Sequence, residues 1–151
     1  MKYRLRTLLL AVTAFVIWLG WEAERMHRQR QANAVIYRVG GVVEYEDAFS
    51  RQVTKHIAKW LGRDAVENIM AVYLGGSAVK DDDLACLQLL PRVREVVLTS
   101  SDVSDAGLPH LYRLSKLETV DLRFTNVTDA GVERLRRALP HARILKKNDL
   151  E

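Results

Sequence analysis

One twelve-residue phrase occurs twice in the chain at a fixed interval. "VSDAGLPHLYRL" begins at Val103 and "VTDAGVERLRRA" begins at Val127, which is 24 residues later, and six of the twelve letters are identical. A duplication in register indicates an internal structural repeat, in which each unit buries its apolar side chains against the next unit. The 24-residue interval therefore constrains the fold more than any other feature of the sequence.

The apolar positions of this phrase extend backward by another 24 residues without a gap. Three leucines and three valines recur in columns, and an aspartate recurs with them, at Leu74, Leu98 and Leu122, at Val79, Val103 and Val127, and at Asp81, Asp105 and Asp129. Val96 and Leu98, which are two residues apart and so point to the same side, predict a short strand. Leucines at three-residue spacing from Leu108 predict a short helix. We predict three repeats and a partial fourth strand around Ile144, because one repeat alone could not bury its leucines.

The conserved letters of the phrase suggest how each helix begins. A hydroxyl residue, Ser104 or Thr128, is followed at once by an aspartate. Such a pair suits a helix start, with the hydroxyl or the carboxylate accepting hydrogen bonds from free backbone N–H groups. Gly107 and Gly131 then predict a close approach of the chain at the turn into the helix.

The spacing L-x-x-L-x-L, followed by S/T-D-A-G-L-x-x-L, resembles a leucine-rich repeat of the variant that carries a T-D-x-G-L phrase. The match covers roughly residues 68–144, and the first repeat departs from it, with "VKDDDL" and Lys80 in place of Ser or Thr. The resemblance implies an α/β fold, a short right-handed leucine-rich-repeat solenoid with parallel strands on one face and short helices on the other. The whole layout also resembles small bacterial membrane proteins with one span and a few such repeats, a group that implies location and architecture rather than an activity.

The amino-terminal segment predicts a transmembrane helix. After a basic start, residues 7–21 carry no charge, and at ~1.5 Å per residue they span about 22 Å, less than the ~30 Å hydrocarbon core. Leu5 and the snorkelling side chain of Arg6 extend the span, and Trp18 and Trp21 suit the opposite interface. We predict an uncleaved signal anchor that crosses the membrane through residues 5–21. A cleavable signal peptide is the alternative, but the stretch around Gly20 lacks the paired small residues that cleavage needs.

Basic residues lie on both sides of this span, so the positive-inside count is nearly balanced. The positive amino terminus favours a soluble domain outside the cytoplasm.

We divide the chain into a signal anchor (1–21), a stalk helix (22–39) stopped by Gly40 and Gly41, an amino-terminal cap (40–67), the repeats (68–146) and a polar tail (147–151). The cap is predicted as a strand in "GGVVEYE" and an amphipathic helix in "RQVTKHIAKWL", with Trp60 covering the first repeat. The alternative is that the basic side of this helix lies on anionic lipid.

Side chains that alternate with the buried strand positions line an exposed sheet face, the usual contact surface of repeat proteins. Its candidate binding residues are Tyr73, Glu95, Val97, Thr99, Thr119, Asp121, Arg123 and Arg143. Because this set mixes aromatic, acidic and basic groups, it predicts an unidentified protein partner contacted without catalysis. The alternative is a purely structural envelope spacer or a self-associating component, in which the same residues only face solvent.

Composition and motifs favour neither an enzyme nor a nucleic-acid-binding protein. The 151 residues hold 23 Lys and Arg against 19 Asp and Glu, and this mild excess of +4 is spread along the chain rather than gathered on one face. The histidines lack metal-ligand spacing and no nucleotide-binding or hydrolase motif occurs, so we expect no metal, no cofactor and no catalytic residue.

Cys86 is the single cysteine. We interpret it as a partly exposed bystander thiol; the alternatives are a disulfide to a second chain and a nucleophile paired with His110.

Overall fold

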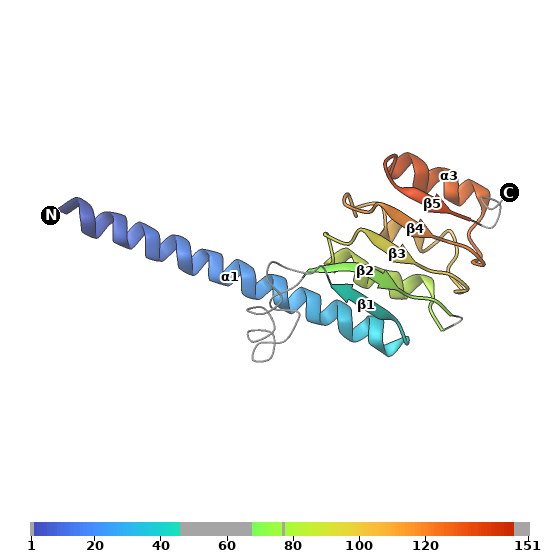
Figure 1. Cartoon of the computed structure of the whole chain (residues 1–151), viewed down its shortest axis with the longest axis horizontal. Helices are drawn as coiled ribbons and strands as arrows, with labels where there is room; N and C mark the ends of the chain where they lie inside the picture. The colour runs from blue at the N-terminus through green and yellow to red at the C-terminus, as the bar shows by residue number, and fades with distance from the viewer. Residues whose placement is uncertain (1, 46–67, 77, 147–151) are drawn as a thin grey trace.

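A computed structural model describes residues 2–45, 68–76 and 78–146 of the chain. The protein combines a long amino-terminal helix with a five-stranded mixed sheet, an α/β arrangement as predicted (Figure 1). The elements in chain order are α1 (Lys2–Arg38), β1 (Val42–Tyr45), β2 (Ile69–Tyr73), η2 (Asp81–Leu89), β3 (Glu95–Val97), η3 (Leu108–His110), β4 (Thr119–Asp121), α3 (Asp129–Ala138) and β5 (Arg143–Leu145). The amphipathic helix predicted in residues 51–61, Trp60 included, and the polar tail lie outside the described residues.

The strands follow one another across the sheet in chain order, β1-β2-β3-β4-β5. β2 to β5 are parallel, and Val72, Val96, Val120 and Ile144 lie opposite one another on successive strands. Each step is 24 residues, so the predicted interval is confirmed as the register of the sheet. β1 confirms the strand predicted after Gly41, and it pairs antiparallel with β2.

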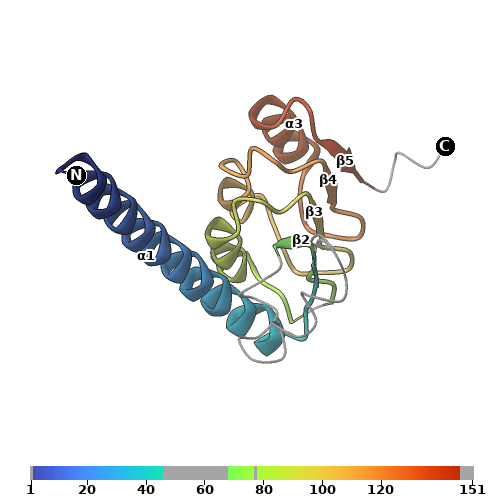
Figure 2. The same ribbon diagram turned by 60° about the vertical axis from the view of Figure 1, so that its left-hand side comes forward.

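Helix α1 is continuous from the predicted membrane segment into the predicted stalk, and it is long and apolar enough to cross a membrane. It stops where the glycines predicted: Gly40 has a φ of +76°, and the N–H of Gly41 donates to the carbonyl of Ile36 at 2.8 Å, as in a Schellman cap. A Cβ on Gly41 would lie 2.7 Å from Cδ2 of Leu74. This close approach seats the end of α1 on the first repeat, beside η2 and β1 (Figure 2).

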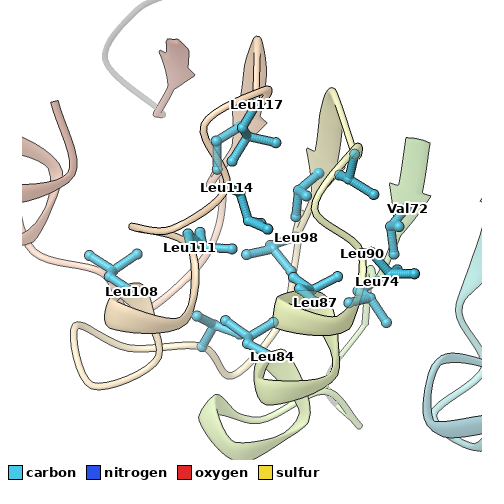
Figure 3. Close-up of a cluster of buried hydrophobic side chains, with 14 of the residues drawn as sticks. Val72, Leu74, Leu84, Leu87, Leu90, Leu98, Leu108, Leu111, Leu114 and Leu117 are labelled. Atoms are coloured by element: carbon cyan, nitrogen blue, oxygen red, sulfur yellow. The ribbon is translucent and has the colours of Figure 1, made fainter. Parts of the chain in front are cut away.

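The apolar columns of the repeat form one buried core between the sheet and the helical layer (Figure 3). The leucines of each repeat that the sequence placed inside are fully buried, namely Leu74, Leu84, Leu87, Leu98, Leu108, Leu111, Leu122 and Leu135. Burial of one such side chain stabilises a fold by about 1.5–3 kcal/mol. The shared core therefore supplies most of the stabilisation, and no single repeat encloses its own leucines.

The helical segments of the three repeats differ in type. η2 and η3 are 3₁₀ helices, and α3 is an α-helix. Pro109 stands at the start of η3, where its ring provides no N–H for helical hydrogen bonding. In α3 the corresponding segment is rich in good helix formers, which sustain ten residues of regular helix.

In the first two repeats the aspartate of the repeated phrase binds the next repeat rather than its own helix. The carboxylate of Asp81 accepts hydrogen bonds from the backbone N–H and the hydroxyl of Ser104, both at 2.7 Å. Asp105 accepts the same two bonds from Thr128, at 2.8 and 2.7 Å. The hydroxyl of Thr128 also accepts from the N–H of Gly131, so for this helix start the hydroxyl is confirmed as the cap and the carboxylate is not the acceptor. We call these inter-repeat bonds the carboxylate ladder.

The glycine of the phrase makes room for this ladder. A Cβ on Gly107 would lie 2.6 Å from Oδ1 of Asp81, and a Cβ on Gly131 would lie 2.2 Å from Oδ1 of Asp105. The close approach predicted at these glycines is thus to a carboxylate of the preceding repeat. Asp129, in the last repeat, accepts from Nζ of Lys146 at 2.6 Å instead.

Replacement of Gly131 by alanine tests the ladder against helix propensity. Gly131 lies inside α3, where alanine would ordinarily add up to about 1 kcal/mol of stability. We expect Gly131→Ala to lower the free energy of unfolding by about 1–3 kcal/mol instead, because the new methyl group displaces the hydrogen-bonded carboxylate of Asp105. Urea denaturation followed by circular dichroism measures the difference. Gly20→Ala is the control, since a Cβ there would meet nothing within 4 Å; a stabilised Gly131→Ala protein would contradict the role of the ladder.

Candidate functional site

The face of the sheet opposite the leucine core carries the candidate binding residues. Val96 is buried, whereas Glu95 and Val97 on either side of it are partly exposed, as alternation along a strand requires. Two rows cross this outer face at successive register positions: Glu44, Ala71, Glu95, Thr119 and Arg143, and then Val42, Tyr73, Val97, Asp121 and Leu145.

The eight predicted residues do not share one degree of exposure. Arg143 is exposed, Asp121 is buried with 5% of its surface accessible, and the remainder are partly exposed. Thr99 and Arg123 follow β3 and β4 and flank Asp121. The register also adds two residues of β1 that sequence reasoning missed, Glu44 and the exposed Val42. No 24-residue column reaches them, because β1 lies outside the repeat and pairs in the opposite direction.

Asp121 and Arg123 form an ion pair on this face, next to Val97 in the row. Nη2 of Arg123 donates to Oδ2 of Asp121 at 2.6 Å, and Nε and the backbone N–H of Arg123 donate to Oδ1 at 3.0 Å. Burial of the Asp121 carboxyl raises its pKa, but the hydrogen bonds and charge of Arg123, with a further bond from Thr99, lower the pKa by more. The pKa of Asp121 therefore lies below its usual range, and the pair is ionised at neutral pH.

Tyr73 joins the outer face to β1. Its phenolic OH donates to Oε2 of Glu44 at 3.0 Å. This hydrogen bond, followed by burial and by the negative charges of Glu95 and Glu44, raises the pKa of Tyr73 above its usual value. The β1–β3 end of the face is therefore acidic, and Arg143 makes the β5 end basic.

An exposed aromatic residue, Phe124, lies just beyond β4. It is 62% exposed and has a φ of +57°, in the left-handed region that side chains other than glycine rarely adopt. Gly76 and Ser100, which precede it by 48 and 24 residues, also have positive φ, at 111° and 60°. A residue with positive φ thus follows each of β2, β3 and β4, and the column Gly76, Ser100 and Phe124 is the signal that could have located Phe124 in the sequence.

Cys86 differs from its sequence-based interpretation. It is 6% exposed, so the prediction of a partly exposed thiol is wrong. Burial raises the pKa of Cys86 to about 11, with a further contribution from the charge of Asp83, so the thiol is protonated at neutral pH and is a poor nucleophile. The ring of His110 contacts the side-chain amide of Gln88, with 2.9 Å between Nδ1 and Nε2. Within the described residues no three His, Cys, Asp or Glu side chains gather in a way that could hold a metal ion.

Comparison with known proteins adds no assignment to this geometry. No protein-family model matches the chain, and no curated protein is significantly similar to it.

Replacement of Asp121 by asparagine tests the ion pair with Arg123. Because the folded-state pKa of Asp121 is depressed, its charge stabilises the fold above the unfolded-state pKa of about 3.9, and this contribution is lost as the pH falls through the folded-state pKa. We expect Asp121→Asn to lower the free energy of unfolding by about 1–2 kcal/mol at pH 7 and by progressively less toward pH 3. Urea denaturation across this range measures the gap. Asp102→Asn, at an exposed carboxylate, is the control; a gap that does not change with pH would rule out the charge of Asp121 as its cause.

Proposed function

We propose that the chain is a membrane-anchored leucine-rich-repeat protein whose outer sheet face contacts another protein without catalysis. The observation that carries the proposal is that two features are packed together in one structure. One is an amino-terminal helix with an exposed apolar surface, and the other is a sheet whose outer face is held directly on the end of that helix.

The exposure of α1 supports membrane anchoring. Its apolar side chains between residues 8 and 21 are exposed, including Leu8, Leu10, Phe15, Ile17, Trp18 and Trp21. A contiguous apolar surface of this length is unfavourable in water and is satisfied by lipid. Farther along the same helix, Ala32 and Ile36 are fully buried against the repeats. The first part of α1 therefore has a surface suited to lipid, and its last part is buried against the repeats. We place the domain outside the cytoplasm because of the basic amino terminus.

The register and the carboxylate ladder support the leucine-rich-repeat assignment. Leucine columns, parallel strands and the S/T-D-A-G phrase all recur every 24 residues, and each has a structural role in joining one unit to the next.

The distribution of side chains on the outer face supports a protein partner. Its centre is the apolar Val97, with Tyr73 on one side and the Asp121–Arg123 pair on the other, which is the combination of an apolar centre and a polar surround that protein interfaces use.

A specific observation also favours a structural spacer. Two pairs of polar side chains on the face satisfy each other, Tyr73 with Glu44 and Asp121 with Arg123, so these four need no partner to complete their hydrogen bonds. The surface that four short parallel strands offer is also smaller than the ~800 Å² that an ordinary specific interface buries on each partner. A spacer and a binding module predict different responses to a charge placed on the face.

Introduction of lysine at Val97 distinguishes these two functions. We expect Val97→Lys to remove at least one protein crosslinked to the wild-type chain in membranes, because a charge at the centre of an apolar contact must be desolvated on binding. Ala106→Lys introduces the same charge at an exposed position beside η3 and is expected to leave the crosslinks unchanged. Mass spectrometry of crosslinked products provides the measurement. Identical products from both variants and the wild type would favour the spacer.

Protease accessibility tests the proposed orientation. Protease added to spheroplasts is expected to digest residues 22–151, because these residues face outward when the amino terminus is inside. Immunoblotting for a tag fused to the carboxyl terminus follows the digestion, and a cytoplasmic marker protein must stay intact as the control. Full protection of the tag until the membrane is permeabilised would reverse the orientation.

A further inference from the structure

A cavity opens where the end of the predicted membrane segment meets the first repeat. Its volume is about 310 Å³, and it is lined by Trp21, Arg25, Arg28, Gln88, Leu89, Pro91 and Arg92. The α1 residues lie three and four apart, so they share one stripe of the helix, and the others come from the end of η2 and the turn after it. Among these lining residues three are arginines and none is acidic.

The arginines are only partly neutralised. Arg25 pairs with Glu22 and donates from Nη1 to Oδ1 of Asn68 at 2.6 Å, while its buried Nε has no hydrogen-bond partner within residues 2–45, 68–76 and 78–146. Arg28 makes one exposed contact of 3.3 Å with Glu24. Nη1 of Arg92 donates to the same amide oxygen of Asn68 at 3.2 Å. Among the residues that the structure describes, these three guanidinium groups pair with two carboxylates, which leaves a net positive charge and unused donors beside the cavity.

The height of the cavity along α1 matches the headgroup layer of a bilayer. With Trp21 at the interface, Arg25 stands about 6 Å and Arg28 about 10 Å farther from the hydrocarbon core, at ~1.5 Å per residue. The headgroup layer on each side of a bilayer is roughly 5–8 Å thick. The backbone of Arg25 therefore lies at the depth of the headgroup layer, and that of Arg28 lies about 2–5 Å beyond it, a distance that a long arginine side chain bridges when it bends back toward the lipid phosphates. The apolar Trp21, Leu89 and Pro91 suit the upper part of an acyl chain.

We infer that this cavity binds the headgroup of an anionic phospholipid, with Arg28 and Arg92 contacting its phosphate and Trp21 contacting the glycerol and acyl region. Guanidinium groups recognise phosphate through paired, charge-assisted hydrogen bonds, and the low dielectric near the membrane strengthens them. The inference rests on the proposed membrane anchoring, since only an inserted α1 brings lipid phosphates to this height. It adds that the first repeat and α1 together hold one lipid.

Thermal unfolding of the full chain in a neutral detergent tests the site. Dihexanoylphosphatidylglycerol is expected to raise the unfolding temperature by about 4 °C, through binding to the folded state, and dihexanoylphosphatidylcholine at equal concentration by much less. Arg28→Gln/Arg92→Gln is expected to abolish the difference between the two lipids. Arg113→Gln/Arg137→Gln lowers the net charge equally at exposed positions outside the cavity and is the matched control.

The outcomes separate the site from simpler explanations. Equal loss in both double variants would overturn the site in favour of general charge attraction, and an equal effect of inorganic phosphate would overturn the lipid as ligand. Extraction of wild-type vesicles with alkaline carbonate tests anchoring separately. A chain that is released from the vesicles contradicts the proposed function, whereas a chain that stays inserted but does not distinguish the two lipids contradicts only the lipid site.

Discussion

Shared burial of leucines between successive repeats is the constraint on which the rest of this structure depends. Each buried leucine contributes about 1.5–3 kcal/mol, and a hydrogen bond to a charged carboxylate contributes a similar amount, but the buried leucines of the repeats outnumber the bonds of the carboxylate ladder. The core therefore holds the repeats together, and the carboxylate ladder has a different task. By tying Asp81 to Ser104 and Asp105 to Thr128, it fixes the spacing at which the leucine columns meet. The repeated phrase pairs an aspartate with a glycine because the carboxylate of one unit occupies the space where the next unit would carry a Cβ.

The sequence was sufficient for the periodic part of the fold. Register, buried leucines and the glycine stop after α1 follow from patterns within a few residues or at a constant interval, and these were predicted correctly. The acceptor role of Asp105 was not predicted, because local capping by the same carboxylate is an equally reasonable use of it and the true donor is 23 residues away. The outer face was predicted as a set of positions, but the ion pair that buries Asp121 depends on the conformation of Arg123 after β4, which no spacing specifies. The cavity beside Trp21 joins residues about 70 positions apart and has no periodic signal.

The column of left-handed residues shows how a repeat carries local strain. A left-handed conformation costs an ordinary residue about 1–2 kcal/mol, and only Gly76 in this column avoids that cost. Ser100 and Phe124 adopt it at equivalent positions, 24 residues apart, in the turns that follow β3 and β4. The hydroxyl groups of Ser101 and Thr125 support these turns, each donating at 2.7 Å to the carbonyl of the leucine three residues earlier. The repeat thus contains a backbone geometry that the individual residues do not prefer.

The continuity of α1 determines where the outer face can act. Ile36 is the last fully buried residue of this helix, and it lies about 22 Å beyond Trp21 at ~1.5 Å per residue. Because the helix is unbroken and Gly41 packs directly on Leu74, no flexible tether separates the span from the repeats. With residues 5–21 in a bilayer, as we propose, the sheet is held at a fixed height and orientation within a few nanometres of the lipid. A partner of the outer face would then have to be a membrane protein or a protein held close to the membrane. The entropy lost on binding such a partner is smaller than for a free protein, since both surfaces are already confined to one plane. A narrow face that would bind weakly in solution is therefore adequate in this setting.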